Sequence, residues 1–209
     1  MPPAGYRRWV RIATVCGSLG VSSTNQAALD VAVDHLRSLG EVDVGVADLS
    51  DIPMFRADQA GRPPESVARL RQLLESADAV LIAAPEYAGG LAGGVKNALD
   101  WLVGSGSLYH RVVGVLTAGT TGGEHALDQL IRTLSWQGAL VVSELGISAP
   151  RTKSDDRGRI TDPGTLSDIA SWGSAVMTAR TGTASERLAI VSAVVTPHGI
   201  DVARFGDLA

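Results

Sequence analysis

Residues 17–25 read Gly-Ser-Leu-Gly-Val-Ser-Ser-Thr-Asn, a segment whose side chains and backbone could bind phosphate. The segment lies between an apolar run and a helical pattern, where unpaired backbone N–H groups, hydroxyls and a helix dipole converge. It lacks both the G-x-G-x-x-G spacing and the lysine of a P-loop. The sequence therefore favours a terminal monophosphate over a dinucleotide or a P-loop nucleotide. The alternative is a plain Ser/Thr/Asn helix cap that binds no ligand.

Two further glycine-rich segments, residues 85–94 and 117–124, could bind a planar ring. Four glycines in the first would let the backbone approach a flat ligand closely, and Tyr87 could form one wall. The hydroxyls and backbone N–H groups of residues 117–124 suit the polar edge of such a ring. No Gly-x-Ser-x-Gly nucleophile elbow is present in the sequence. Lys96 and Asp100, four residues apart on an expected helix, are interpreted as a surface ion pair.

The elements that must position these segments follow from apolar periodicity. Runs that are apolar throughout, or nearly so, predict buried strands at residues 10–16, 79–84 and 112–116, and a further strand at 140–142. Alternation at residues 42–46 predicts a strand at the edge of the sheet. Helical patterns lie between these strands, so the chain is expected to be an α/β protein with a mostly parallel sheet. In such sheets ligands bind at the carboxyl ends of the strands, where all three glycine-rich segments fall.

The pattern changes after residue 182. Residues 188–196 and 200–205 are rich in β-branched and apolar side chains, and Pro197-His198-Gly199 between them is a turn signal. The sequence therefore predicts a main domain over residues 1–182 and a C-terminal β-hairpin extension over residues 183–209.

Composition limits the possible partners. The chain has 209 residues, a formal net charge of −4 and 45% hydrophobic residues, as expected for one globular domain with an appendage. No basic cluster indicates a nucleic-acid or membrane surface, and the apolar runs are shorter than the roughly 20 residues of a membrane helix. A single cysteine, Cys16, excludes an intrachain disulfide and favours a cytoplasmic location.

Two motifs give the sequence a family resemblance. Gly17, Ser18, Leu19, Ser23 and Asn25 match a GSLR-x-x-S-x-N phosphate loop, while Pro85, Glu86, Tyr87, Gly89, Lys96, Asn97, Asp100 and Trp101 match a PEYNGS-x-x-x-x-x-KNAIDW segment. Together, over about residues 9–180, the chain resembles the NADPH-dependent FMN reductase family.

The resemblance implies a flavodoxin-like three-layer sandwich around a central parallel five-stranded sheet. It implies an oxidoreductase that transfers a hydride from NADPH or NADH to FMN, and then to free flavin, a quinone or another small acceptor. Flavin supplies the redox chemistry, so no catalytic side chain or metal ligand is assigned. A homodimer or homotetramer is implied, with its interface on the helices that follow residues 85–94 and 117–124. Cofactor contacts are implied at Ser18, Gly20, Ser23, Asn25, Pro85, Glu86, Tyr87, Ala88, Gly89, Thr117, Gly119 and Gly122.

Three positions depart from the family pattern. Gly20 stands where the family usually has an arginine, Ala88 where it has asparagine, and Gly90 where it has serine. One charge-assisted bond and two polar contacts are thereby missing. Two alternatives remain open, namely a flavodoxin-type electron carrier and a non-flavin family member that acts as a subunit or regulator. Flavin colour would distinguish the reductase and the electron carrier from the non-flavin member, and NADPH oxidation would distinguish the reductase from the carrier.

Overall fold

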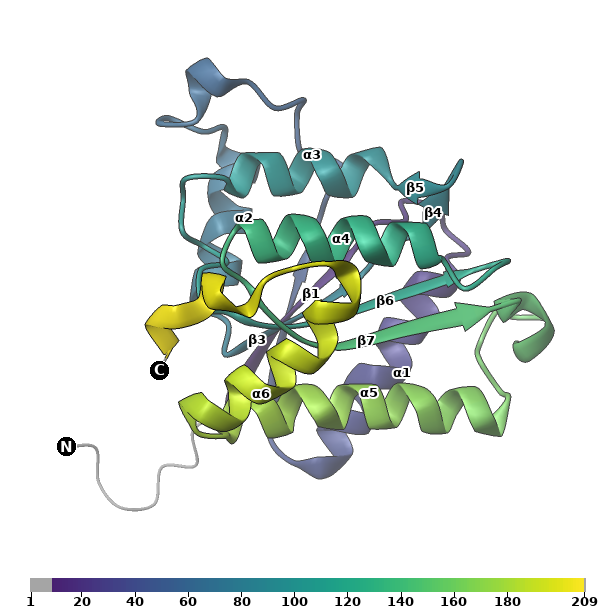
Figure 1. Cartoon of the computed structure of the whole chain (residues 1–209). Helices are drawn as coiled ribbons and strands as arrows, with labels where there is room; N and C mark the ends of the chain where they lie inside the picture. The colour runs from purple at the N-terminus through teal and green to yellow at the C-terminus, as the bar shows by residue number, and fades with distance from the viewer. Residues whose placement is uncertain (1–8, 209) are drawn as a thin grey trace.

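A single parallel sheet forms the centre of the computed structural model, which describes residues 9–208 (Figure 1). Its strands are β1 (Val10–Cys16), β2 (Val42–Ala47), β3 (Ala79–Ala83), β6 (Val112–Gly119) and β7 (Leu140–Ser148). They are ordered β2-β1-β3-β6-β7, and every neighbouring pair is parallel. This is the flavodoxin-like order, and the predicted five-stranded parallel sheet is confirmed. The chain changes direction across the sheet between β1 and β3, which opens a crevice at their carboxyl ends.

Helices cover both faces of this sheet. The principal helices are α1 (Thr24–Leu39), α2 (Glu65–Ser76), α3 (Gly93–Leu102), α4 (Glu124–Trp136) and α5 (Pro163–Thr181). In Figure 1, α1 and α5 lie below the sheet, whereas α2, α3 and α4 lie above it. A small antiparallel pair, β4 (Glu86–Tyr87) and β5 (Gly90–Leu91), stands outside the main sheet. The predicted three-layer sandwich is therefore confirmed.

Burial explains why the sequence pattern identified the strands. Every residue of β3 is buried, and β6 is buried up to its last residue, so both strands need apolar side chains on two faces. β2 lies at one edge, as its alternating pattern predicts. Trp101 is completely buried, and its indole N–H donates to the Pro53 carbonyl over 2.8 Å. That bond anchors the irregular connection that includes η1 (Ala57–Gln59).

The predicted C-terminal hairpin is wrong. Residues after Gly182 form helix α6 (Ala184–Val195), followed by the short turns η3 (Thr196–His198) and η4 (Val202–Leu208). Thr183 begins α6 with a capping box, because its hydroxyl accepts from the Glu186 N–H and the Glu186 carboxylate accepts from the Thr183 N–H. The apolar residues of this segment resemble a strand only because they are β-branched. Val191 and Val195 are buried and four residues apart, which is helical spacing.

This C-terminal segment is nevertheless ordered and packed, as its apolar content predicts. Val191, Val195 and Phe205 belong to the same buried core as the sheet, and α6 lies in front of the edge strand β7 in Figure 1. His198 adds a polar attachment, since its ring nitrogens lie 2.9 Å from a Glu144 carboxylate oxygen on β7 and 3.3 Å from an Asp128 oxygen on α4. No helix among residues 9–208 is long and apolar enough to cross a membrane.

Candidate functional site

A cavity of about 560 Å³ opens at the carboxyl ends of β1, β3, β6 and β7. This volume lies within the range of small-molecule sites. Its lining residues are Ser18, Ser22, Ser23, Thr24, Asn25, Pro85, Glu86, Tyr87, Ala118, Gly119, Thr120, Ala149, Pro150, Arg151 and Thr152. The three glycine-rich segments of the sequence therefore meet at one place, together with a fourth segment that follows β7.

Seven of the residues selected from the sequence line this cavity, namely Ser18, Ser23, Asn25, Pro85, Glu86, Tyr87 and Gly119. Gly20, Ala88, Gly89, Thr117 and Gly122 are not among the lining residues. Positive φ angles at Ala88, Gly89 and Gly122 show that these three shape the loops next to the cavity.

The loop after β1 presents hydroxyls where α1 begins. Ser23 is the N-cap of α1, and its Oγ accepts a hydrogen bond from the Gln26 N–H over 3.1 Å and lies 3.9 Å from the Cys16 Sγ. Gly17 allows this loop to pass beneath α3, since a side chain there would collide with Val95. Cys16 lies below the loop with its Sγ 3.6 Å from the Ser18 carbonyl oxygen. Burial raises the pKa of the Cys16 thiol, and Cys16 packs against the hydrophobic core.

Asn25 connects two loops of the site. Its side chain is 3% exposed, and its amide nitrogen donates to the Ala118 carbonyl over 3.1 Å while its amide oxygen accepts from the Ala118 N–H over 2.9 Å. Both amide groups thus bond to the backbone at the end of β6. The first role of Asn25 is therefore to fix the loop after β1 against the loop after β6, which sequence alone did not indicate.

The loop after β3 is a tight hairpin between β4 and β5. Its two central residues, Ala88 and Gly89, have φ angles of 52° and 69°, the left-handed pair of a type I′ turn. α4 holds the hairpin, because Gln129 Oε1 accepts from the Leu91 N–H over 2.9 Å. Glu86 in turn accepts from the Ala126 N–H at the start of α4 over 3.1 Å. The Tyr87 side chain remains 63% exposed beside the cavity.

A hydrogen bond between two of its own residues stabilises the loop after β6. Thr117 is fully buried, and its hydroxyl donates to the Gly122 carbonyl, so it folds the loop and does not face the cavity. Gly119 and Thr120 do line the cavity. Their carbonyl oxygens both accept from the Ala149 N–H, at 3.1 and 3.3 Å, which joins this loop to the segment after β7.

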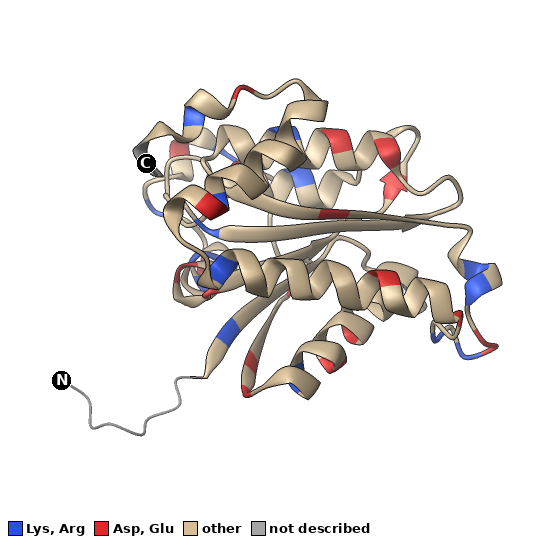
Figure 2. Ribbon diagram, turned by 60° about the horizontal axis from the view of Figure 1, so that its bottom comes forward, with Lys and Arg blue, Asp and Glu red and all other residues tan. Residues whose placement is uncertain are grey.

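That fourth segment, η2 (Pro150–Lys153), was missed by the sequence analysis. It brings Arg151 and Thr152 to the cavity, and Arg151 is the only cationic residue among those that line it. Figure 2 shows a basic turn projecting beyond the end of the sheet at the place that η2 occupies in Figure 1. The signal was available, since residues that follow a strand of a parallel sheet lie at the same carboxyl edge as the other loops.

These groups suit FMN. Hydroxyls at the start of α1 and one arginine match a phosphate, while a narrow hairpin with an exposed tyrosine matches a planar ring. The one acidic residue in the lining, Glu86, already accepts a hydrogen bond at the start of α4, where the helix dipole favours negative charge.

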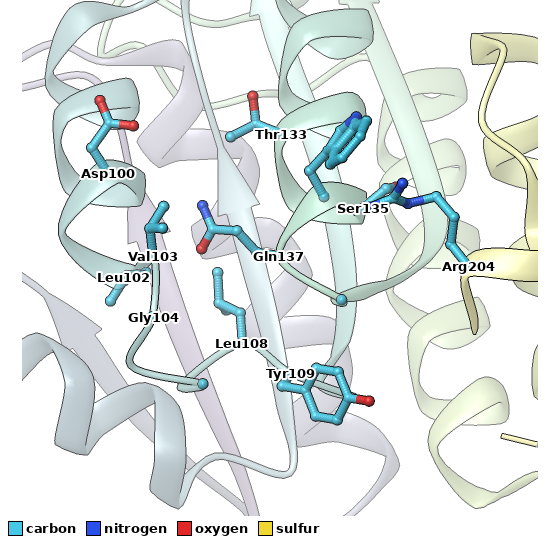
Figure 3. Close-up of a pocket in the computed structure, with 13 residues that line it drawn as sticks. Asp100, Leu102, Val103, Gly104, Leu108, Tyr109, Thr133, Ser135, Gln137 and Arg204 are labelled. Carbon is cyan, nitrogen blue, oxygen red and sulfur yellow. The ribbon is translucent and has the colours of Figure 1, made fainter. Parts of the chain in front are cut away.

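A second cavity, of about 780 Å³, lies at the opposite, amino edge of β6 and β7 (Figure 3). It is bounded by the C-terminal ends of α3 and α4 and by Arg204 of η4. Trp136 and Tyr109 belong to its lining, and the Arg204 guanidinium lies 3.7 Å from the centroid of the Trp136 ring. None of the residues selected from the sequence as cofactor contacts lines this cavity.

Curated relatives named as reductases match part of this chain. Over 94 residues, 44% of this chain and 49% of the relative, the chain is 38% identical to an NAD(P)H-dependent FMN reductase of Pseudomonas aeruginosa, PA1204. A quinone reductase of Escherichia coli K12 is 28% identical over 169 residues, 77% of this chain and 89% of the relative. The chain spans about half the length of several curated relatives that it matches.

Solved structures and a family model agree with these relatives. The flavoenzyme FerB of Paracoccus denitrificans, an NAD(P)H:(acceptor) oxidoreductase, superposes with a TM-score of 0.69 at 25% identity, covering 81% of this chain and 98% of that one. An NADH:FMN oxidoreductase, EMOB, shares the fold with a TM-score of 0.65 at 18% identity, covering 85% of this chain and 94% of that one. The family model for NADPH-dependent FMN reductases matches residues 10–153, which include the loops after β1, β3 and β6 and all of η2. The chain belongs to the NADPH-dependent FMN reductase family.

Proposed function

We propose that this protein is an NAD(P)H-dependent flavin reductase that passes a hydride from a nicotinamide cofactor to FMN and then to free flavin, a quinone or another small acceptor. The observation that carries the proposal is the convergence of a hydroxyl-rich loop at the start of α1 and a narrow hairpin on one cavity at the carboxyl edge of the sheet. The activities in the names of the P. aeruginosa and E. coli relatives support it.

The residues of the cavity would bind and orient the cofactor. Ser18, Ser22 and Ser23 supply hydroxyl donors for the FMN phosphate, close to the positive end of the α1 dipole. Pro85 and Tyr87 provide apolar and aromatic surface for the ring, and the hairpin turn at Ala88 and Gly89 sets their direction. FMN, when bound, supplies the redox chemistry, so the protein contributes position and a polar backbone environment.

The decisive experiment is a titration of the purified protein with FMN and with riboflavin, followed by steady-state oxidation of NADPH and NADH with a panel of acceptors. We expect FMN to bind more tightly than riboflavin and NAD(P)H oxidation to require FMN. FMN binding without NAD(P)H oxidation would indicate an electron carrier instead. Absence of FMN binding would contradict the proposal and leave the non-flavin subunit or regulator as the better explanation.

Assembly, location and domain division are further parts of the proposal. A homodimer or homotetramer through α3 and α4 is supported by the exposed side chains of Val103, Tyr109 and Trp136 beside the ends of these helices. A cytoplasmic location is supported by the lone Cys16. Residues 1–182 are proposed as the FMN-binding domain and residues 183–209 as its extension.

A further inference from the structure

The loop after β1 carries no cation for a phosphate. No Lys, Arg or His occurs within residues 17–25, and Gly20 occupies the position at which the family usually has an arginine. A Cβ added at Gly20 would meet nothing within 4 Å, and Gly20 does not have a positive φ angle. The side of the loop at position 20 is therefore open, and neither space nor backbone conformation demands glycine there.

A cation reaches the same cavity from the other side. After β7 the chain turns at Ala149, whose φ and ψ of 46° and 48° are left-handed, and then enters η2. Two backbone bonds fix the turn, from the Ala149 N–H to Gly119 and Thr120, and the Thr152 N–H donates to the Ala149 carbonyl over 3.0 Å. This arrangement places Arg151 in the lining of the cavity that also contains Ser22 and Ser23.

No hydrogen bond or ion pair to the Arg151 guanidinium is found within residues 9–206, so it has no competing partner there. Arg159, by contrast, is held by Asp155 over 2.6 Å. An exposed arginine in the same cavity lining as three serines presents a planar set of donors that suits a phosphate monoester, which accepts two parallel N–H bonds.

We propose that Arg151 supplies the phosphate cation that the loop after β1 lacks, so that in this chain the FMN phosphate is bound between α1 and η2. The inference rests on the proposed function and deepens it. Arg151 is a binding residue that sets the preference for the phosphorylated flavin. The same chemistry would suit the 2′-phosphate of NADPH, but the hydroxyls that share the cavity with Arg151 belong to the FMN-phosphate motif.

Flavin binding to Arg151→Gln measures the effect directly. Titrations of FMN and riboflavin, followed by quenching of flavin fluorescence, should show FMN affinity reduced about tenfold or more and riboflavin affinity changed less than about twofold. Arg157→Gln is the matched control, because Arg157 lies in the following loop outside the cavity lining and should leave both affinities unchanged. Both variants should keep the melting temperature of the wild-type protein, since Arg151 is exposed.

Rescue provides the second arm. Gly20→Arg added to Arg151→Gln returns a cation to the open side of the loop, so FMN affinity should recover while riboflavin affinity stays constant. FMN affinity unchanged in Arg151→Gln, in a wild-type protein that prefers FMN to riboflavin, would overturn the inference and leave the proposed function intact. A raised KM for NADPH but not for NADH, with FMN binding unchanged, would assign Arg151 to the dinucleotide and also overturn it. Failure of the wild-type protein to bind FMN would refute the proposed function itself, and the inference with it.

Discussion

The two cavities at opposite edges of the sheet differ in chemistry more than in size. The larger, at the amino edge, is bounded by the ends of α3 and α4, by aromatic side chains and by Arg204, whose guanidinium stacks on Trp136. The smaller, at the carboxyl edge, is lined by hydroxyls, the start of α1 and one arginine. Helix C-termini present carbonyl oxygens and partial negative charge, whereas helix N-termini present N–H groups and partial positive charge. The direction of the helices therefore favours the smaller cavity for a phosphorylated ligand, and volume alone would mislead.

The largest effect on stability is expected at Asn25, which joins two loops of the carboxyl-edge cavity. Asn25→Ala leaves the buried N–H and C=O of Ala118 without partners, so the free energy of unfolding should fall by about 2–5 kcal/mol. Urea denaturation measures this, with Thr24→Ala as the control on the same turn of α1. FMN and riboflavin should lose affinity together, because the loops would separate. A selective loss of FMN with unchanged stability would instead make Asn25 a direct phosphate ligand.

Ser23→Ala tests the polar character of this cavity. Removing a hydroxyl donor to a charged phosphate should weaken FMN about tenfold, with riboflavin nearly unaffected. Loss of the α1 cap should also lower stability by about 1 kcal/mol. Ser135→Ala, at the amino-edge cavity, is the matched control and should leave flavin binding unchanged. Equal losses for both flavins in Ser23→Ala would show that this loop does not hold the phosphate.

Trp136→Ala tests the amino-edge cavity. The side chain is 68% exposed and stacks with Arg204, so its removal should cost less than about 1 kcal/mol of stability. FMN affinity should change less than about twofold, while sedimentation should detect weaker self-association, as expected for an interface on α3 and α4. Loss of FMN binding with a normal melting temperature would contradict the contrast between the cavities.

The smallest expected effect concerns the hairpin turn beside the carboxyl-edge cavity. Ala88 has a left-handed backbone that asparagine tolerates better, and Asn-Gly is the preferred pair for a type I′ turn. Ala88→Asn should therefore stabilise the protein by about 0.5–1 kcal/mol, raising the melting temperature by about 1–4 °C. Ala88→Val is the opposite control, because a β-branched residue at positive φ should destabilise it. A lower melting temperature for Ala88→Asn would show that the turn is not strained.

Local patterns predicted most of the sheet and its helices, because strands buried on both faces require uninterrupted apolar runs, as in β3. The same patterns failed for α6, where β-branched residues outweighed the capping-box pair Thr183 and Glu186. Motifs identified residues that meet at one cavity on the carboxyl edge of the sheet. They did not indicate that Asn25 bonds to Ala118, 93 residues away, because such a contact exists only in the folded chain. They also missed Arg151, whose place in the cavity depends on the turn after β7.

The position of α6 beside β7 bears on the solubility of shortened forms of the protein. An edge strand exposes unpaired N–H and C=O groups, which can recruit strands of other molecules into aggregates. A chain cut at Gly182 would also uncover the apolar surface that Val191, Val195 and Phe205 now bury. The region matched by the family model ends at residue 153, well before this segment. Domain boundaries for expression are therefore best drawn beyond η4, because the last helix protects the sheet from intermolecular pairing.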